Sequence, residues 1–142
     1  MMFLILSFIF NLQAETRVKS LRDSSSVEIN KLLNEKKMAL IFQKDCMACE
    51  SQIKDLKCFD SKDIVLLGVN SSEKVLRQEV RSFRVPYSAY KADEEALKAM
   101  NITVDATPLI ILLKQGHGSL YRGTRPCEEY KQLYNKKGTS RG

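Results

Sequence analysis

The sequence has no tryptophan, only one histidine, three prolines and six glycines among its 142 residues. So few glycines and prolines exclude a collagen-like or low-complexity chain. Its longest strongly apolar run is too short to span a bilayer, which excludes a polytopic membrane protein. The composition is otherwise that of an ordinary globular protein, with 44% hydrophobic and 28% charged residues. The length is that of one domain.

Basic residues exceed acidic ones, 23 against 17, which gives a net charge of +6. Such an excess can support binding to nucleic acid or to an anionic surface. The basic residues are spread along the chain, however, apart from a group near the C-terminal end, and no aromatic-basic motif accompanies them. We therefore expect no nucleic-acid partner.

Residues 1–14 differ from the rest of the chain. They read MMFLILSFIFNLQA, an apolar run followed by a short polar stretch that ends in a small residue. This pattern predicts a secretory signal peptide cleaved after Ala14, although no Lys or Arg precedes the run. The domain would then be residues 15–142. A buried N-terminal strand or helix and an uncleaved membrane anchor are the alternatives.

Two hydrophobic periods alternate along the remaining residues. The short apolar run MALIF is typical of a strand buried on both faces. Ser25 followed by Glu28 fits a capping box at a helix start. Expected strands cover residues 17–21, 38–42, 64–69, 109–113 and 120–122, and expected helices cover residues 25–35, 46–57, 73–83, 93–100 and 124 onward. Because two parallel strands flank a helix and a hairpin precedes the last helix, the pattern predicts a three-layer α/β domain with a mixed central sheet.

The candidate chemistry lies in the motif Cys46-Met47-Ala48-Cys49, which follows a predicted buried strand and begins a predicted helix. A helix N-terminus presents free amides and about half a positive charge. Both features stabilise a thiolate, so we expect the pKa of the Cys46 thiol to fall below its usual value. Cys46 would be the exposed nucleophile and Cys49 the resolving thiol one turn further on, because only a thiolate attacks a disulfide.

A CxxC motif can also be half of a metal site. A zinc site would need Cys58, Cys127 or His117 as further ligands, and their spacing matches no common pattern. A copper carrier would need more histidine or methionine near the cysteines than His117 and Met47 provide. We therefore expect no metal and no bound cofactor, because the two thiols can hold the electrons themselves.

At these residues the chain resembles the thioredoxin-like superfamily, and most closely its exported TlpA/ResA-like branch. The similarity covers roughly residues 38–133 and rests on MALIFQ, CMAC, IVLLGVN, FRVPYSAYKAD and NITVDATPLIILLKQGHGSLYRG. It implies a thioredoxin-like fold with a cis proline beside the CxxC motif, at Thr107-Pro108. The Thr107 backbone would pair with a substrate segment as an added strand. Pro108, Met47 and Ala48 would complete the substrate surface.

The sequence departs from this family in two places. The aromatic residue and the proline usual near the motif are replaced by Gln43-Lys44-Asp45 and by Met47-Ala48. Leu40 stands where many thioredoxins bury an aspartate. A proton acceptor for Cys49 must therefore be another group or water. Lys44 and Glu50 lie close in sequence, but charged residues at a helix start are usually just solvated.

Cys58 and Cys127 allow three interpretations: a structural disulfide, two inert cysteines, or a redox relay. The helix that carries the motif and the last helix lie on one side of the sheet in thioredoxin-like folds, which makes a disulfide possible. If Cys58 lay on the same helix, it would be on the side opposite Cys49 and would point away from the sheet; alternatively, it lies beyond the end of that helix.

Together these observations predict an exported, periplasmic thiol–disulfide oxidoreductase that reduces protein disulfides through a mixed disulfide. It would act as a monomer on protein substrates that carry disulfides or thiols, and a membrane electron-donor protein would keep it reduced. The alternative is a non-catalytic thioredoxin-fold module that binds a partner or carries a metal.

Overall fold

The computed structural model describes residues 16–137, and the predicted signal segment lies outside them. Within this range seven strands form one sheet in the order β2-β1-β5-β4-β3-β6-β7. The strands are β1 (Arg17–Ser20), β2 (Ser26–Glu28), β3 (Met38–Gln43), β4 (Ile64–Val69), β5 (Ser88–Lys91), β6 (Leu109–Lys114) and β7 (His117–Arg122). The helices are α2 (Ile29–Asn34), α3 (Met47–Lys54), α4 (Glu73–Phe83), α5 (Glu94–Lys98), α6 (Cys127–Lys137) and the 3-10 turn η1 (Ser61–Asp63).

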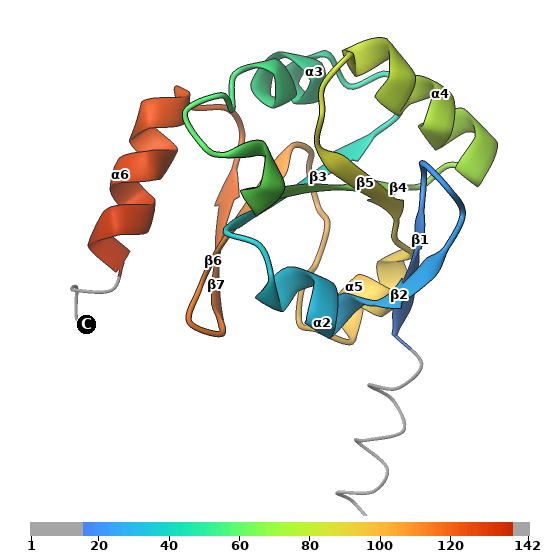
Figure 1. Ribbon diagram of the computed structural model, residues 1–142, viewed down its shortest axis with the longest axis horizontal. Helices are drawn as coiled ribbons and strands as arrows, with labels where there is room; N and C mark the ends of the chain where they lie inside the picture. Colours follow the sequence, from blue (N-terminus) through green and yellow to red (C-terminus); the bar gives the residue numbers. More distant parts are fainter. Residues whose placement is uncertain (1–15, 138–142) are drawn as a thin grey trace, which may run out of the picture.

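Helices cover both faces of the sheet, with α3, α4 and α6 on one side and α2 and α5 on the other (Figure 1). Alternate residues of β3 explain the two layers. Leu40 and Phe42 pack into the core under α3, α4 and α6, whereas Ala39 and Ile41 pack under α2 and α5. All four are fully buried, as expected for a central strand with two covered faces. The predicted three-layer α/β fold is confirmed.

The centre of the sheet has the predicted βαβ and ββα units. Strands β3 and β4 are adjacent and parallel, with Met38 opposite Ile64, and α3 connects them along the chain. Strand β6 is antiparallel to β3 and forms a hairpin with β7 before α6. At Gly68 of β4 an added Cβ would lie 2.8 Å from Cζ of Phe42, so glycine lets that ring pack directly on the strand. The register places the ends of β3 and β4 and the start of β6 at one edge, where the motif lies.

The helix start predicted at Ser25 is wrong. Residues 26–28 form β2, which pairs with β1, and α2 begins only at Ile29. The Ser25 hydroxyl donates to Asp23 Oδ1 at 2.8 Å instead of capping the helix, and Glu28 pairs with Arg17 across the two strands. The capping box does not form, because pairing of β2 with β1 satisfies the backbone N–H and C=O groups of residues 26–28 instead.

The sequence analysis gives no element at residues 88–91, where the structure has strand β5. Its sequence SAYK is short and of mixed polarity, and its pairing with β4 and β1 makes it a strand. The helix expected over residues 46–57 ends at Lys54, with Asp55 as its C-cap outside helical backbone geometry. The residues that follow, including Cys58, are therefore not bound to helical spacing.

No helix within residues 16–137 is long and apolar enough to cross a membrane.

Tyr130 of α6 gives the fold a measurable pH dependence. Its ring is fully buried and its hydroxyl donates to the Gly123 carbonyl oxygen at 3.2 Å. Burial raises its pKa to about 12, whereas an unfolded tyrosine titrates near about 10. The stabilisation from the neutral phenol is complete below pH ~10 and is lost as the pH rises through ~12, because the unfolded chain releases its proton first.

We therefore expect the difference in unfolding free energy between the wild type and Tyr130→Phe to shrink between pH ~10 and ~12. Urea unfolding of both proteins at several alkaline pH values measures it. A difference that stays constant across this range would contradict the burial of an uncharged phenol.

Candidate active site

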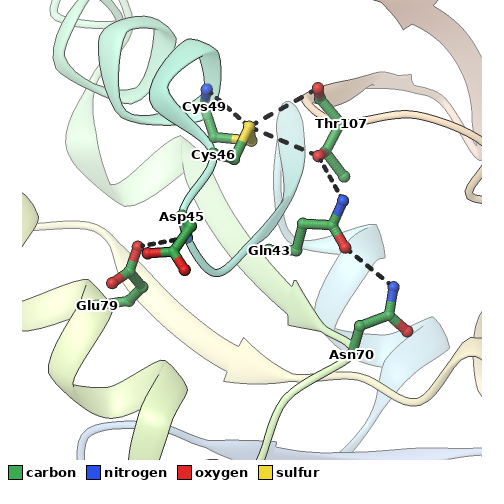
Figure 2. The surroundings of a disulfide bond; sticks show 7 residues. All are labelled: Gln43, Asp45, Cys46, Cys49, Asn70, Glu79 and Thr107. Atoms are coloured by element: carbon green, nitrogen blue, oxygen red, sulfur yellow. Dashed lines mark hydrogen bonds between the residues drawn. A yellow bond between two sulfur atoms is a disulfide. The ribbon is translucent and has the colours of Figure 1, made fainter.

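The motif lies where β3 leaves the sheet and α3 begins. Asp45 in the connecting turn has a φ of 60°, and its N–H donates to the Glu79 carboxylate of α4 at 3.2 Å (Figure 2). Glu79 thereby holds the turn from a neighbouring helix. Cys46 is the N-cap of α3, so its side chain lies at the positive end of the helix.

Cys46 and Cys49 form a disulfide, with Cα atoms 5.2 Å apart. The Cys49 N–H donates to Cys46 Sγ at 3.1 Å, which places a helix-terminal amide on that sulfur. Cys46 is partly exposed, whereas Cys49 is fully buried in the core under α3. Only the first sulfur can meet a bulky partner, and the second can reach only the first.

Thr107 and Pro108 lie beside Cys46, although 61 residues separate Thr107 from it in sequence. The pairing of Leu109 with Ile41 brings the start of β6 to the end of β3. The Thr107-Pro108 peptide bond is cis. The Thr107 hydroxyl donates to Cys46 Sγ at 3.5 Å, and the Thr107 carbonyl oxygen lies 3.7 Å from the same sulfur.

The two residues inside the motif lie at the surface. Met47 is 85% exposed, the more exposed of the two large hydrophobic side chains that stand out from the described part of the chain. Ala48 beside it is exposed as well. Glu50 accepts a hydrogen bond from Lys54 at 3.0 Å, and Lys44 is exposed. An apolar, accessible surface therefore adjoins Cys46, while Glu50 is engaged along the helix.

Leu40 occupies the position that could have held a buried acid. It is fully buried in the same cluster as Cys49, together with Phe42 and Ile53. Cys49 is thus packed among apolar side chains, and position 40 supplies no carboxylate to it.

Sequence reasoning missed two polar residues of the site, Gln43 and Asn70. Gln43 Nε2 donates to Thr107 Oγ1 at 3.1 Å, and Asn70 Nδ2 donates to Gln43 Oε1 at 3.1 Å (Figure 2). Gln43 ends β3 and Asn70 directly follows β4. Polar residues at the ends of adjacent parallel strands meet at one sheet edge, and this signal could have found them.

Charged groups near Thr107 are paired. Arg122 Nε donates to Asp105 at 2.8 Å, and this hydrogen bond lowers the pKa of the Asp105 carboxyl. The same contact raises the pKa of Arg122. Asp105, two residues before Thr107, is therefore ion-paired with Arg122 at neutral pH.

The structure joins Cys58 to Cys127 in a second disulfide, with Cα atoms 6.1 Å apart. Cys58 lies beyond the end of α3, which removes the objection that it would point away on the helix. Contacts around the bond support the docking of α6. The Cys127 N–H donates to Asp55 Oδ2 at 3.2 Å, and Lys131 Nζ donates to the Cys58 carbonyl oxygen at 3.1 Å.

His117 begins β7 and pairs with Lys114, at the end of the hairpin remote from Pro108. It therefore cannot join the motif cysteines in one site. Over residues 16–137 no group of three His, Cys, Asp or Glu side chains could hold a metal ion.

Neither a family model nor a curated protein matches the chain. Solved structures do match it. DsbF of Mycobacterium tuberculosis, in its mixed oxidised and reduced forms, superposes with a TM-score of 0.67 at 14% identity, over 87% of this chain and 96% of that one. A thiol:disulfide interchange protein of the thioredoxin family from Chlorobium tepidum gives 0.66 at 17% identity, over 84% and 90%.

A secreted disulfide oxidoreductase of Mycobacterium tuberculosis, homologous to E. coli DsbE, gives 0.65 at 10% identity, over 89% of this chain and 96% of that one. These likenesses extend over nearly the whole length of both partners. Together with the sheet order and the disulfide at the start of α3, they show that the chain has the fold of the thioredoxin-like superfamily.

Proposed function

We propose that this chain is a thiol–disulfide oxidoreductase that reduces protein disulfides. The proposal is carried by one observation: a disulfide at the N-terminus of α3 has one accessible sulfur and one buried sulfur, and the accessible one lies against Thr107. A bond used only for stability gains nothing from an exposed sulfur. The likeness to solved thiol–disulfide oxidoreductases supports the same activity.

In the proposed cycle the Cys46 thiolate attacks one sulfur of a substrate disulfide. A Cys46–substrate disulfide forms and the other substrate sulfur leaves as a thiolate. The Cys49 thiolate then attacks Cys46 Sγ, which restores the Cys46–Cys49 disulfide and expels the second substrate thiolate. Two electrons have passed to the substrate, and the two substrate sulfurs take up protons from solvent.

The pair must then be reduced again. We propose that a membrane electron-donor protein supplies two electrons through its own dithiol, by the same exchange in reverse. The substrate would contact the exposed Met47 and Ala48 and the half-buried Thr107, and the buried Pro108 would fix the course of the chain beside them. An extended substrate segment would lie along Thr107, and apolar substrate side chains would cover Met47.

We further propose export to the periplasm with cleavage after Ala14, and action as a monomer. The apolar start of the sequence supports export, as does the secreted Mycobacterium tuberculosis neighbour. The second disulfide fits the same compartment, because disulfides persist in oxidising surroundings.

The reduction potential of the Cys46–Cys49 pair tests this function. Purified protein is equilibrated against glutathione and dithiothreitol buffers, and its free thiols are counted by mass after alkylation. We expect a potential near the thioredoxin end of the scale, about −270 mV. A value near about −120 mV would make the protein a disulfide donor instead. A pair that does not titrate reversibly would favour the non-catalytic, partner-binding module.

A further inference from the structure

A chain of three hydrogen bonds leads from the surface to the sulfur of Cys46 (Figure 2). Asn70 Nδ2 donates to Gln43 Oε1 at 3.1 Å, and Gln43 Nε2 donates to Thr107 Oγ1 at 3.1 Å. The Thr107 hydroxyl donates to Cys46 Sγ at 3.5 Å. Every donor in this chain points toward the sulfur.

We propose that Gln43 and Asn70 are positioning residues that aim the Thr107 hydroxyl at Cys46 and thereby favour the Cys46 thiolate. The inference rests on the proposed function, in which that thiolate is the nucleophile. A hydroxyl has one proton and two acceptor lone pairs. When the Gln43 amide donates to the Thr107 oxygen, the hydroxyl proton is left for another acceptor, and Cys46 Sγ is within reach.

Asn70 decides which end of the Gln43 amide faces Thr107. A glutamine side chain has an acceptor end and a donor end. Because the Asn70 amide donates to Gln43 Oε1, the NH2 end of Gln43 turns to Thr107. With the opposite orientation, Gln43 Oε1 would accept the Thr107 hydroxyl proton and take it away from the sulfur.

The fold fixes all three residues. Gln43 is the last residue of β3, and Thr107 precedes the Pro108 that leads into β6. Asn70 has a φ of 64°, a conformation that asparagine adopts more readily than most residues. Gln43 and Thr107 are half-buried, which shields their hydrogen bond from water, whereas Asn70 is exposed. We therefore expect Gln43 to contribute more than Asn70.

Other groups also set the acidity of Cys46. The amide of Cys49 and the N-terminus of α3 favour the thiolate, whereas the Thr107 carbonyl oxygen can accept from the protonated thiol and so opposes it. The charged residues on the adjoining elements are Glu79 of α4, Lys44 and Asp45 of the turn, the Glu50–Lys54 pair of α3 and the Asp105–Arg122 pair. The substitutions below leave these groups unchanged.

The pKa of Cys46 tests the proposal. A Cys49→Ala background leaves Cys46 as the free thiol, and its pKa is measured from the pH dependence of alkylation by iodoacetamide. We expect Thr107→Val, which removes the hydroxyl, to raise the pKa by about one unit, and Gln43→Met by about half a unit. Gln43→Glu should raise it further, because a carboxylate accepts the Thr107 proton and adds negative charge.

Asn70→Gly removes the outer amide without backbone strain and should give a smaller rise than Gln43→Met. Gln78→Met is the matched control, because Gln78 lies exposed on α4; the pKa of Cys46 should not change. The decisive comparison is the double variant. If Gln43 acts through Thr107, Gln43→Met has no further effect on the pKa in a Thr107→Val protein.

An equal shift with and without the Thr107 hydroxyl would overturn the proposal, as would an unchanged pKa in both Gln43 variants. The reduction potential measured on the wild type separates this failure from failure of the proposed function. A pair that exchanges reversibly while the Gln43 variants keep the wild-type pKa refutes only the positioning role. A pair that does not exchange, with a pKa that still shifts, refutes only the function.

Discussion

Replacing Cys46 with serine is expected to abolish disulfide reduction, whereas replacing Cys49 with serine is expected to trap a mixed disulfide with the substrate. A serine hydroxyl stays protonated at neutral pH and forms no disulfide, so the first variant cannot begin the cycle. In the second variant the Cys46 sulfur still lies at the helix N-terminus with its exposed side available. It reacts once and then lacks its resolving thiol.

Insulin reduction measures turnover, and non-reducing electrophoresis with mass spectrometry detects the trapped adduct. Ser51→Ala is the matched control, because Ser51 is an exposed residue of α3 that has no role in the proposed site; it should retain wild-type turnover. Residual turnover in Cys46→Ser would refute the assignment of the nucleophile. An adduct formed by Cys46→Ser, and none by Cys49→Ser, would mean that the two roles are exchanged.

Removing the Cys58–Cys127 disulfide should lower the free energy of unfolding more than removing the Cys46–Cys49 disulfide. In the double variant Cys58→Ala with Cys127→Ala, a loop closed between residues 69 positions apart is opened. Loop-closure entropy for this length is about 4 kcal/mol at 25 °C. With an m-value of about 2 kcal/mol/M, the urea midpoint should fall by about 2 M. Unfolding followed by far-UV circular dichroism measures the change.

The Cys46–Cys49 bond provides the comparison, because it spans a separation of only three residues. Opening it in Cys46→Ser with Cys49→Ala should cost about half as much, and the serine keeps a capping oxygen at the start of α3. Equal losses in the two double variants would contradict the entropic account. Alkylation mapped to Cys58 and Cys127 in the oxidised, denatured wild type would show that these two cysteines are not joined.

This cross-link holds α6 against the end of α3. Arg125 N–H donates to Gln52 Oε1 at 2.8 Å, and Gln52 is almost fully buried. The Cys127 N–H donates to Asp55, the C-cap residue of α3. The helix that carries the motif is thus fixed at its C-terminal end by hydrogen bonds and a covalent bond, while its N-terminal end carries the exposed sulfur.

The central strands of the sheet and the location of the redox motif could be predicted from the sequence. Runs such as MALIF and IVLLGV are apolar at every position, and only a strand covered on both faces buries all of them. A CxxC motif directly after such a strand must lie at a sheet edge and, with a helix following, at a helix N-terminus. These features follow from neighbours along the chain, so a local pattern was enough.

Features that depend on residues distant in sequence could not be predicted in this way. Strands β2 and β5 exist because β1 and β4 pair with them, and their own sequences are too short and too polar to show it. Pairing between β1 and β2 likewise overrode the capping pattern at Ser25. Cys58 reaches Cys127 because α3 ends at Lys54, earlier than its sequence indicated.

The same holds for the polar side of the site. Gln43 and Asn70 follow two strands that the sequence already predicts to be parallel, but only the pairing of β6 with β3 brings Thr107 to them. Their meeting depends on the register of β3 against both β4 and β6, a relation between residues tens of positions apart. Because β3 and β4 are apolar on both faces, their sequences show no alternation that could fix this register, and the packing and hydrogen bonds of the whole sheet determine it.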